Sequence, residues 1–236
     1  MGPITLVGVD GCKQGWVCVF VRTDAAPAVC VLPTARNVLA RFPSPAIIAV
    51  DIPIGLTDAD RRACDIEARR CLRAPRASSV FPAPIRPILN CSSHRAASEL
   101  HRTIDGRGFG AQAWGILPKI KEWDDALQSA LARRSEVFEV HPEVCFWMLD
   151  SQRPMRYSKH TEEGARERRR LLNRAFGRAT VVAVLSSLAR QGAKDDDVLD
   201  SLALLWTAGR IARHEASSLP EKVETDRVGL PMAIWY

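Results

Sequence analysis

LVGVDGCKQGWVCVFV, residues 6–21, places an aspartate where an apolar run stops and a turn begins. The run ends at Asp10, Gly11 follows, and apolar residues resume at Trp16. Apolar runs joined by short glycine-containing links are typical of β-strands with tight turns. Asp before Gly is also ordinary turn chemistry. Asp10 is therefore either a turn residue or a functional carboxylate at the end of a buried strand.

Short apolar segments predict a five-stranded sheet. The strands are expected at 4–10, 16–22, 28–32, 46–52 and 136–141. The first three have short links, which favours an antiparallel meander. Segment 46–52, AIIAVDI, is almost wholly apolar, which indicates a strand buried on both faces at the centre of a parallel arrangement. The end of the chain, LPMAIWY, predicts a last edge strand.

The segment between the fourth and fifth strands, about 56–135, predicts a helical insertion. Prolines at close intervals in 73–88 exclude a regular element there. Helices are expected at 34–41, 58–72, 92–103, 112–132, 162–176, 179–190 and 195–212. We therefore expect one α/β domain over 1–236, with a mixed five-stranded sheet flanked by helices.

Composition narrows the function classes. The 236 residues are 47% hydrophobic and 25% charged, which is ordinary for a globular protein. No stretch reaches the roughly 18 apolar residues of a membrane span, and the N-terminus lacks a secretory signal, so we expect a cytoplasmic protein without membrane contact. Seven cysteines without a CxxC pair argue against zinc. The net charge of +6 favours an anionic partner, such as nucleic acid or a phosphorylated metabolite.

Carboxylates recur where the predicted strands end. Asp10 ends the first strand, Asp51 the fourth, and Glu139 lies near the end of the fifth. Asp197 and Asp200 begin the last helix and share a face, because they are three residues apart. Ligands in open α/β sheets bind beyond the carboxyl ends of parallel strands, so these acids should gather at one edge.

A cluster of carboxylates predicts bound divalent cations. Mg²⁺ or Mn²⁺ relieves the repulsion between acids and prefers oxygen ligands. Two such ions about 4 Å apart can activate a water and stabilise the leaving oxygen of a phosphodiester. Each acid also has a simpler interpretation: Asp10 and Asp51 as turn residues, Asp197 as a helix cap, and Glu139 as the partner of an arginine.

Other side chains are candidates for the same site. His141 shares a strand face with Glu139 and is either a catalytic or metal-binding group or a structural histidine. Arg73 and Arg76 are candidates for phosphate binding, against the simpler view of a solvated basic loop. Gln112 and Trp114 follow the glycine-rich loop 106–110 and could contact substrate, although a tryptophan there is more often part of the core.

Several long blocks together resemble one known family. The blocks VGVDGCKQGWV, AVDIPIGL, RASSVFPAP, QAWGILPKI, FEVHPEVCFW and DDVLDSLALLWTA, from Val7 to Ala208, resemble the family catalogued as domain of unknown function 429, described as predicted ribonuclease H-like nucleases. The order of the expected strands and of the closing helix is also that of the ribonuclease H-like fold.

The resemblance assigns roles to individual residues. It implies that the family's acidic positions fall on Asp10, Asp51, Glu139 and Asp197, with Asp200 one turn further on. His141 and Glu143 belong to its HPE motif. Segment 158–164, SKHTEEG, departs from the lysine- and proline-rich stretch expected there, although Lys159 is retained as a substrate-binding candidate.

Three function classes follow from these observations. The first is a metal-dependent nuclease or phosphodiesterase acting on a nucleic acid or nucleotide. The second is an inactive nucleic-acid- or nucleotide-binding module on the same fold. The third is an ATP-dependent phosphotransferase, although such enzymes need two domains of this type and 236 residues are too few. The sequence leaves open the choice of DNA, RNA or small nucleotide, and whether the protein is a homodimer.

Overall fold

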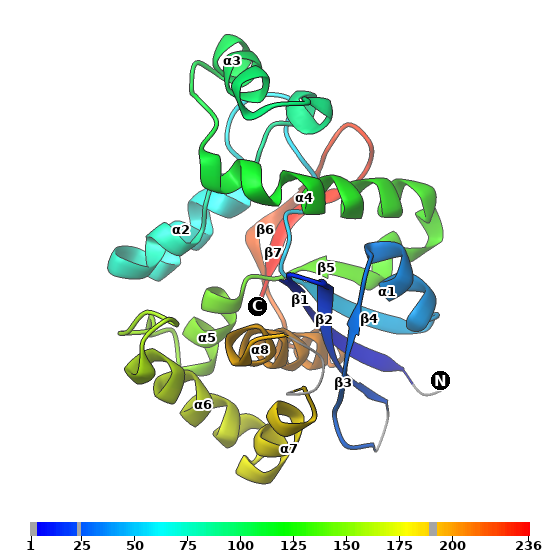
Figure 1. Cartoon of the computed structure of the whole chain (residues 1–236), viewed down its shortest axis with the longest axis vertical. Helices are drawn as coiled ribbons and strands as arrows, with labels where there is room; N and C mark the ends of the chain where they lie inside the picture. The colour runs from blue at the N-terminus through cyan, green and yellow to red at the C-terminus, as the bar shows by residue number, and fades with distance from the viewer. Residues whose placement is uncertain (1–3, 23–24, 189–192) are drawn as a thin grey trace.

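A mixed five-stranded sheet forms the centre of the molecule (Figure 1). The computed structural model describes residues 4–22, 25–188 and 193–236. The strands lie in the order β3-β2-β1-β4-β5. Their bounds are β1 Thr5–Cys12, β2 Gly15–Arg22, β3 Ala28–Leu32, β4 Ala46–Val50 and β5 Val137–Glu139. β1, β2 and β3 are antiparallel, whereas β4 is parallel to β1 and β5 to β4. This confirms the predicted α/β sheet and is consistent with a ribonuclease H-like fold.

The first hairpin extends beyond the rest of the sheet. β1 continues past Asp10 to Cys12, and Asp10 pairs with Val17 of β2. The turn is made by the two residues between Cys12 and Gly15, and Gly15 has a φ of +132°, which favours glycine. Asp10 is therefore a strand residue, and the prediction that the strand ends there was wrong by two residues.

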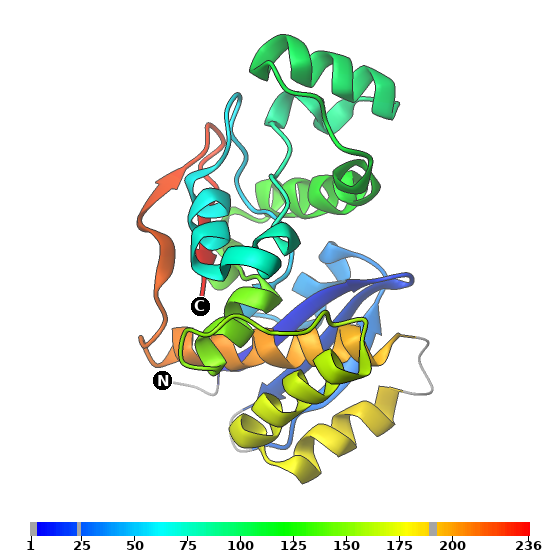
Figure 2. The same ribbon diagram turned by 90° about the vertical axis from the view of Figure 1, so that its left-hand side faces the viewer.

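Helices cover both faces of the sheet (Figures 1 and 2). One face carries α8, Asp195–Ala212, together with α5, α6 and α7, at Pro142–Leu149, Glu162–Phe176 and Arg178–Leu188. The other face carries α1, Ala35–Arg41, and α4, Ala111–Ser129. Alternating residues of each strand supply the two cores. Val9 and Val50 belong to the α4 side, and Ala49 belongs to the α8 side.

Gly8 allows α8 to lie directly on the sheet. A Cβ at position 8 would stand 2.0 Å from the carbonyl oxygen of Ser201 and 2.4 Å from the backbone nitrogen of Leu205. Both are helix backbone atoms, which cannot rotate away. The hydroxyl of Ser201 also donates a hydrogen bond of 3.3 Å to the carbonyl oxygen of Val17. The first turns of α8 are therefore held at a fixed height above β1.

Helices fill the segment between β4 and β5. It contains α2, α3 and α4, at Ala63–Arg76, His94–Asp105 and Ala111–Ser129, and three short 3-10 helices at Ala77–Ser79, Arg86–Asn90 and Leu131–Glu136. Pro118 lies inside α4 without ending it. The backbone of α2 leaves helical geometry at Arg73, where φ is 50°.

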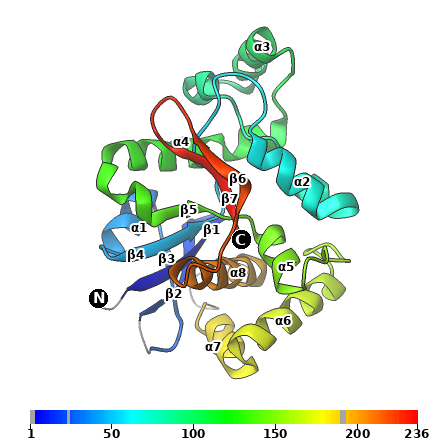
Figure 3. The same cartoon turned by 180° about the vertical axis from the view of Figure 1, so that it is seen from behind.

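The sequence patterns did not predict two elements, one helix and one strand. α5 follows β5 immediately, and β6, Ser218–Thr225, precedes the last strand. The predicted edge strand exists as β7, Pro231–Trp235, but it pairs with β6 in a separate two-stranded sheet (Figure 3). It meets the main sheet through a single bridge between Val140 and Trp235.

Two further expectations are settled only for the described residues. The helix expected over 179–190 corresponds to α7, and positions 189–190 lie outside the described residues. Among the helices that the structure describes, none combines the length and the apolar character needed to cross a membrane.

Gly8→Ala tests the contact between α8 and β1. The added methyl group meets backbone on both sides, so we expect a loss of at least about 3 kcal/mol in the free energy of unfolding, at the upper end of overpacking costs. Gly115→Ala is the matched control, because nothing lies within 4 Å of its Cβ position and alanine favours a helix by up to about 1 kcal/mol. Urea unfolding measures both. Equal stability of the two variants would contradict the close contact.

Candidate functional site

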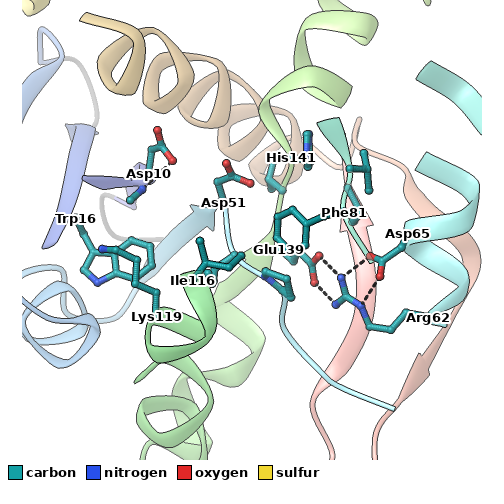
Figure 4. A pocket seen from close by; sticks show the side chains of 16 residues that line it. Asp10, Trp16, Asp51, Arg62, Asp65, Phe81, Ile116, Lys119, Glu139 and His141 are labelled. Carbon is teal, nitrogen blue, oxygen red and sulfur yellow. Dashed lines mark hydrogen bonds and ion pairs between the residues drawn. The ribbon is translucent and has the colours of Figure 1, made fainter. Parts of the chain in front are cut away.

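The pairing of β1 with β4 brings Asp10 and Asp51 together. Val9 lies opposite Val50, and the backbone N–H of Asp51 donates to the carbonyl oxygen of Val9 at 2.9 Å. Gly8 contacts α8, so Asp10, two residues later, faces the same helix. Figure 4 shows both carboxylates directed toward the same space, on the side of α8. They line one cavity.

α8 brings a third carboxylate to this space. Asp200 is only 1% exposed and precedes Ser201, the residue that contacts Gly8. Lys159, from the segment between α5 and α6, places its Nζ 2.6 Å from Oδ2 of Asp200. Burial alone lowers the pKa of an ammonium group, but the neighbouring carboxylates raise the pKa of Lys159 overall, Asp200 most strongly. Lys159 is therefore a fixed positive charge beside the acids.

The acids of this cluster repel one another. Burial raises the pKa of Asp10 well above its ordinary value, and the charges of Asp51 and Asp200 raise it further. Burial also raises the pKa of Asp51, although His141 and Lys159 oppose the shift. The pKa of the half-buried Asp197 is raised by burial as well, while its carboxylate accepts the backbone N–H of Lys194 at 3.1 Å. Asp197 therefore caps α8 at the margin of this group of acids. We call the group Asp10, Asp51, Asp197 and Asp200 the acid cluster.

Oxygen atoms of the acid cluster lack partners. Asp10 is 7% exposed, and one of its oxygens accepts the backbone N–H of Gly11 at 2.7 Å. Within residues 4–22, 25–188 and 193–236, no hydrogen-bond donor reaches its second oxygen or the carboxylate of Asp51. All the atoms that the acid cluster could offer to a metal ion are oxygens, and oxygen ligands suit Mg²⁺ or Mn²⁺.

The spacing of the acid cluster is wider than that of a closed metal cage. Among the described residues, no three residues of the acid cluster each place a ligand atom within 4.8 Å of the others. Mg²⁺ usually retains several waters and takes only one or two protein carboxylates directly, so the donor set fits such an ion.

Glu139 lines the same cavity as Asp10 and Asp51, as predicted, but its carboxylate is bound to an arginine and is not part of the acid cluster. Its register partner is Val50, so its side chain points to the α4 side of the sheet, with Val9 and Val50. Both of its oxygens bind the guanidinium of Arg62, at 2.7 and 2.8 Å (Figure 4). Asp65 binds the same guanidinium at 2.6 Å. The alternative interpretation, a glutamate paired with an arginine, describes this residue.

A second group of potential ligands lies around Glu139. Cys64, Asp65 and Glu139 each place one ligand atom within 4.8 Å of the others, and this buried group could hold a metal ion. Arg62 already supplies the positive charge there. Burial and the nearby Asp65 raise the pKa of Glu139 to about 7, in spite of Arg62. The proximity of a guanidinium makes this group a poorer cation site than the acid cluster.

His141 lies next to the acid cluster as the N-cap of α5. Its Nδ1 accepts the backbone N–H of Glu143 at 3.2 Å, and its Nε2 lies 3.3 Å from the carbonyl oxygen of Ser79. Both ring nitrogens therefore have a backbone partner. Glu143, the next acid of the HPE motif, pairs with the buried Arg168 and lines a cleft with Asp51 and Asp200. His141 is therefore held in place by backbone and faces Asp51.

The predicted substrate-binding residues divide into two groups. Arg76, Gln112 and Lys159 line one cleft with Asp51 and Asp200. Arg73 is exposed at the kink of α2 and does not line this cleft. Trp114 packs on His94, with ring centroids 6.0 Å apart, and against the main core, as the simpler interpretation expects.

Sequence reasoning missed Lys119 and Arg62. Lys119 donates a hydrogen bond of 2.6 Å to the carbonyl oxygen of Gly15, and its Nζ lies 4.2 Å above the ring centroid of Trp16. It lines the same cavity as Asp10 and Asp51, and burial lowers its pKa. Its only sequence signal was its place in the block QAWGILPKI. Arg62 gave no signal, because it lies among other charged residues before α2.

A family model spans this geometry from β1 to β6. The chain belongs to the family described as "Protein of unknown function (DUF429)". The model matches residues 8–225, which include the whole acid cluster, Lys159, Lys119 and Arg62. No curated protein and no solved structure matched the chain. The resemblance noted from the sequence blocks is thus confirmed at the level of the DUF429 family.

Asp10→Asn tests the electrostatic strain of the acid cluster. The folded protein binds the proton of Asp10 more tightly than the unfolded chain does, so stability is lost as the pH rises above the ordinary aspartate value of 3.8. We expect Asp10→Asn to be more stable than the wild type at neutral pH, with the gap closing in acid. Urea unfolding in chelator across this pH range measures the difference.

Asp125→Asn is the control for this experiment. Asp125 is exposed and pairs with Lys121 at 2.8 Å, so its loss should change stability by only about 0.3–0.5 kcal/mol. A gap between Asp10→Asn and the wild type that does not change with pH would contradict the raised pKa.

Arg62→Met tests the role of the second carboxylate group. Removing the guanidinium leaves Asp65 and Glu139 buried without a counter-charge, and we expect a loss of about 3–5 kcal/mol in the free energy of unfolding at neutral pH. Arg95→Met, at an exposed pair with Glu99, should cost less than about 1 kcal/mol. Thermal and urea unfolding compare them. A fully stable Arg62→Met protein would show that something other than Arg62 neutralises these acids.

Proposed function

We propose that this protein is a metal-dependent phosphodiesterase that acts on nucleic acid or nucleotides. The observation that carries the proposal is Asp10, which is 7% exposed and has an oxygen that no donor in the described residues reaches. Asp51 and Asp200 lie beside it, and a cleft with Arg76 and Lys159 adjoins it. A buried carboxylate with neighbours of the same charge is stabilised by a cation, and adjoining basic residues favour a phosphate.

The chain's own residues divide the work as follows. Asp10, Asp51 and Asp200 would hold divalent cations, which supply an activated water and stabilise the charge on the departing oxygen. Lys159 balances the charge of Asp200 and lines the cleft, where it could also bind a phosphate. His141, held by two backbone groups, presents a ring of fixed orientation to Asp51. Asp197 anchors the start of α8.

The proposed reaction is a balanced hydrolysis. Water oxygen forms a bond to phosphorus as the bond from phosphorus to one ester oxygen breaks. One proton leaves the attacking water, and the departing oxygen takes up a proton to become a hydroxyl group. No oxidant, reductant or nucleoside triphosphate is consumed. The carboxylates of the buried acids repel the reacting phosphate unless positive charges lie between them. Lys159 and the bound cations are therefore essential to the approach of substrate.

A metal titration with cleavage assays tests the function. Mg²⁺ or Mn²⁺ should raise the melting temperature of the wild type, with a stabilisation of about 2.7 kcal/mol at a concentration of 100 times Kd. Asp51→Asn should lose most of this shift and at least about 100-fold in cleavage rate, because it removes a direct ligand. Chelator should abolish cleavage. Cleavage is screened over single-stranded, duplex, hybrid and branched substrates.

Glu139→Gln is the matched control for the metal titration. It alters the carboxylate group around Arg62 and leaves the acid cluster intact, so the metal-induced shift should persist. A shift lost in Glu139→Gln and kept in Asp51→Asn would move the metal site to Cys64, Asp65 and Glu139. A shift without cleavage of any substrate would favour a binding module on this fold.

A further inference from the structure

Two cavities meet at the acid cluster. The inner pocket has a volume of about 200 Å³ and is lined mainly by apolar side chains, Trp16, Ile52, Pro53, Val80, Phe81 and Ile116. The outer cleft has a volume of about 410 Å³ and is lined mainly by polar ones, Arg76, Ser78, Gln112, His141, Ser158 and Lys159. Asp51, Phe81 and His141 line both. A ligand that fills both cavities must therefore pass the acid cluster.

The inner pocket has the size and surface of a site for one flat ring. A dry cavity of about 150 Å³ takes up benzene, so 200 Å³ accommodates a single heterocycle with its substituents. Phe81 and Ile116 offer flat and apolar walls (Figure 4). Polar groups also line this pocket: Lys119 and Arg62 can donate hydrogen bonds, and the carboxylates of Asp10, Asp51, Asp65 and Glu139 can accept them. A nucleobase combines an aromatic face with polar edges and matches this lining.

The outer cleft suits the anionic part of the same ligand. Its volume falls in the usual range for small-molecule sites, about 300–1,000 Å³. Lys159 and Arg76 are cations on its wall, and the Nε of Arg76 is buried without a hydrogen-bond partner in the described residues. Ser78 and Gln112 add exposed polar groups. The acids Asp51, Glu143 and Asp200 also line it, so an anion is expected there only with the cations in place.

We infer that the substrate presents an unpaired nucleotide, with its base in the inner pocket and its phosphodiester at the acid cluster. The inference rests on the proposed function and names its substrate class. The pocket walls come from segments far apart in the sequence, with Trp16 on β2, Phe81 before α3 and Ile116 on α4. A base stacked and paired in a duplex cannot enter a pocket of this size unless it is first flipped out, at a cost in unstacking. Single-stranded ends and dinucleotides need no such step.

Three variants and three substrates test the inference. Cleavage with Mn²⁺ is compared for a dinucleotide, a single-stranded oligonucleotide and its duplex. Binding is measured by calorimetry with Mn²⁺ and a dinucleotide in which both bridging ester oxygens are replaced by methylene, so that neither bond to phosphorus can be hydrolysed. Ile116→Phe fills the inner pocket, and Phe81→Ala removes its aromatic wall. Ile104→Phe is the control, since Ile104 is 39% exposed on α3 and lines neither cavity.

Ile116→Phe and Phe81→Ala should each weaken binding of the analogue by at least about fivefold, the lower end of the loss for one stacked base. Ile104→Phe should bind as the wild type does. The duplex should be cleaved at least about tenfold more slowly than the single strand. Faster turnover of the dinucleotide would indicate a small free nucleotide as substrate, and faster turnover of the oligonucleotide would indicate a strand end. A Mn²⁺-induced melting shift equal to that of the wild type shows that each variant is folded with its acid cluster intact.

The outcomes separate the two proposals. Equal cleavage of duplex and single strand, or analogue binding unchanged in Ile116→Phe, would overturn the inner pocket as a base site and leave the phosphodiesterase standing. Analogue binding that depends on Ile116, without cleavage of any substrate, would support the pocket and overturn the phosphodiesterase.

Discussion

The contact between Gly8 and the backbone of α8 fixes the geometry on which the acid cluster depends. A side chain at this position would lift the helix from the sheet, because its Cβ would lie 2.0 Å from a helix carbonyl. Asp10 and Asp200 lie close to this contact along β1 and α8. Their carboxylates therefore meet across an interface whose spacing is set by two backbones. Repulsion between them cannot be relieved by a shift of the helix, so a counter-charge has to be supplied in place.

The pleat of the strands decides which acids meet. Asp10 and Asp51 follow parallel neighbours and share the α8 face, so their proximity could be predicted from apolar runs that end in aspartate. Glu139 also ends a strand, yet it lies in register with Val50 and faces α4. The alternation of side chains within β5 can be read from the sequence. Which of its residues share a face with those of β4 cannot, because this depends on a strand register set by distant packing. A shift of one residue reverses the face.

Local patterns predicted the elements better than the contacts between them. The strands and most of the helices follow from apolar periodicity and from proline and glycine positions. Lys159 and Lys119 reach the site from segments 41 and 109 positions away in sequence from Asp200 and Asp10. Their side chains are long and flexible, so no spacing rule places them there. The edge strand β7 was predicted but its partner β6 was not, because SLPEKVET carries charged residues and lacks a clear strand pattern.

Ion pairing with arginine distinguishes the other buried acids from the acid cluster. Arg62 serves Asp65 and Glu139, Arg86 serves Asp124 and Asp226, and Arg168 serves Glu143. Each of these guanidiniums is itself buried and is paired directly with its acids. Within the described residues, the acid cluster is paired instead with a lysine from a loop, Lys159, and it opens on two cavities, one of which Lys119 also lines. The fold neutralises its structural acids with buried arginines. It leaves the acids of the cluster without such a partner, because their counter-charge arrives with a ligand.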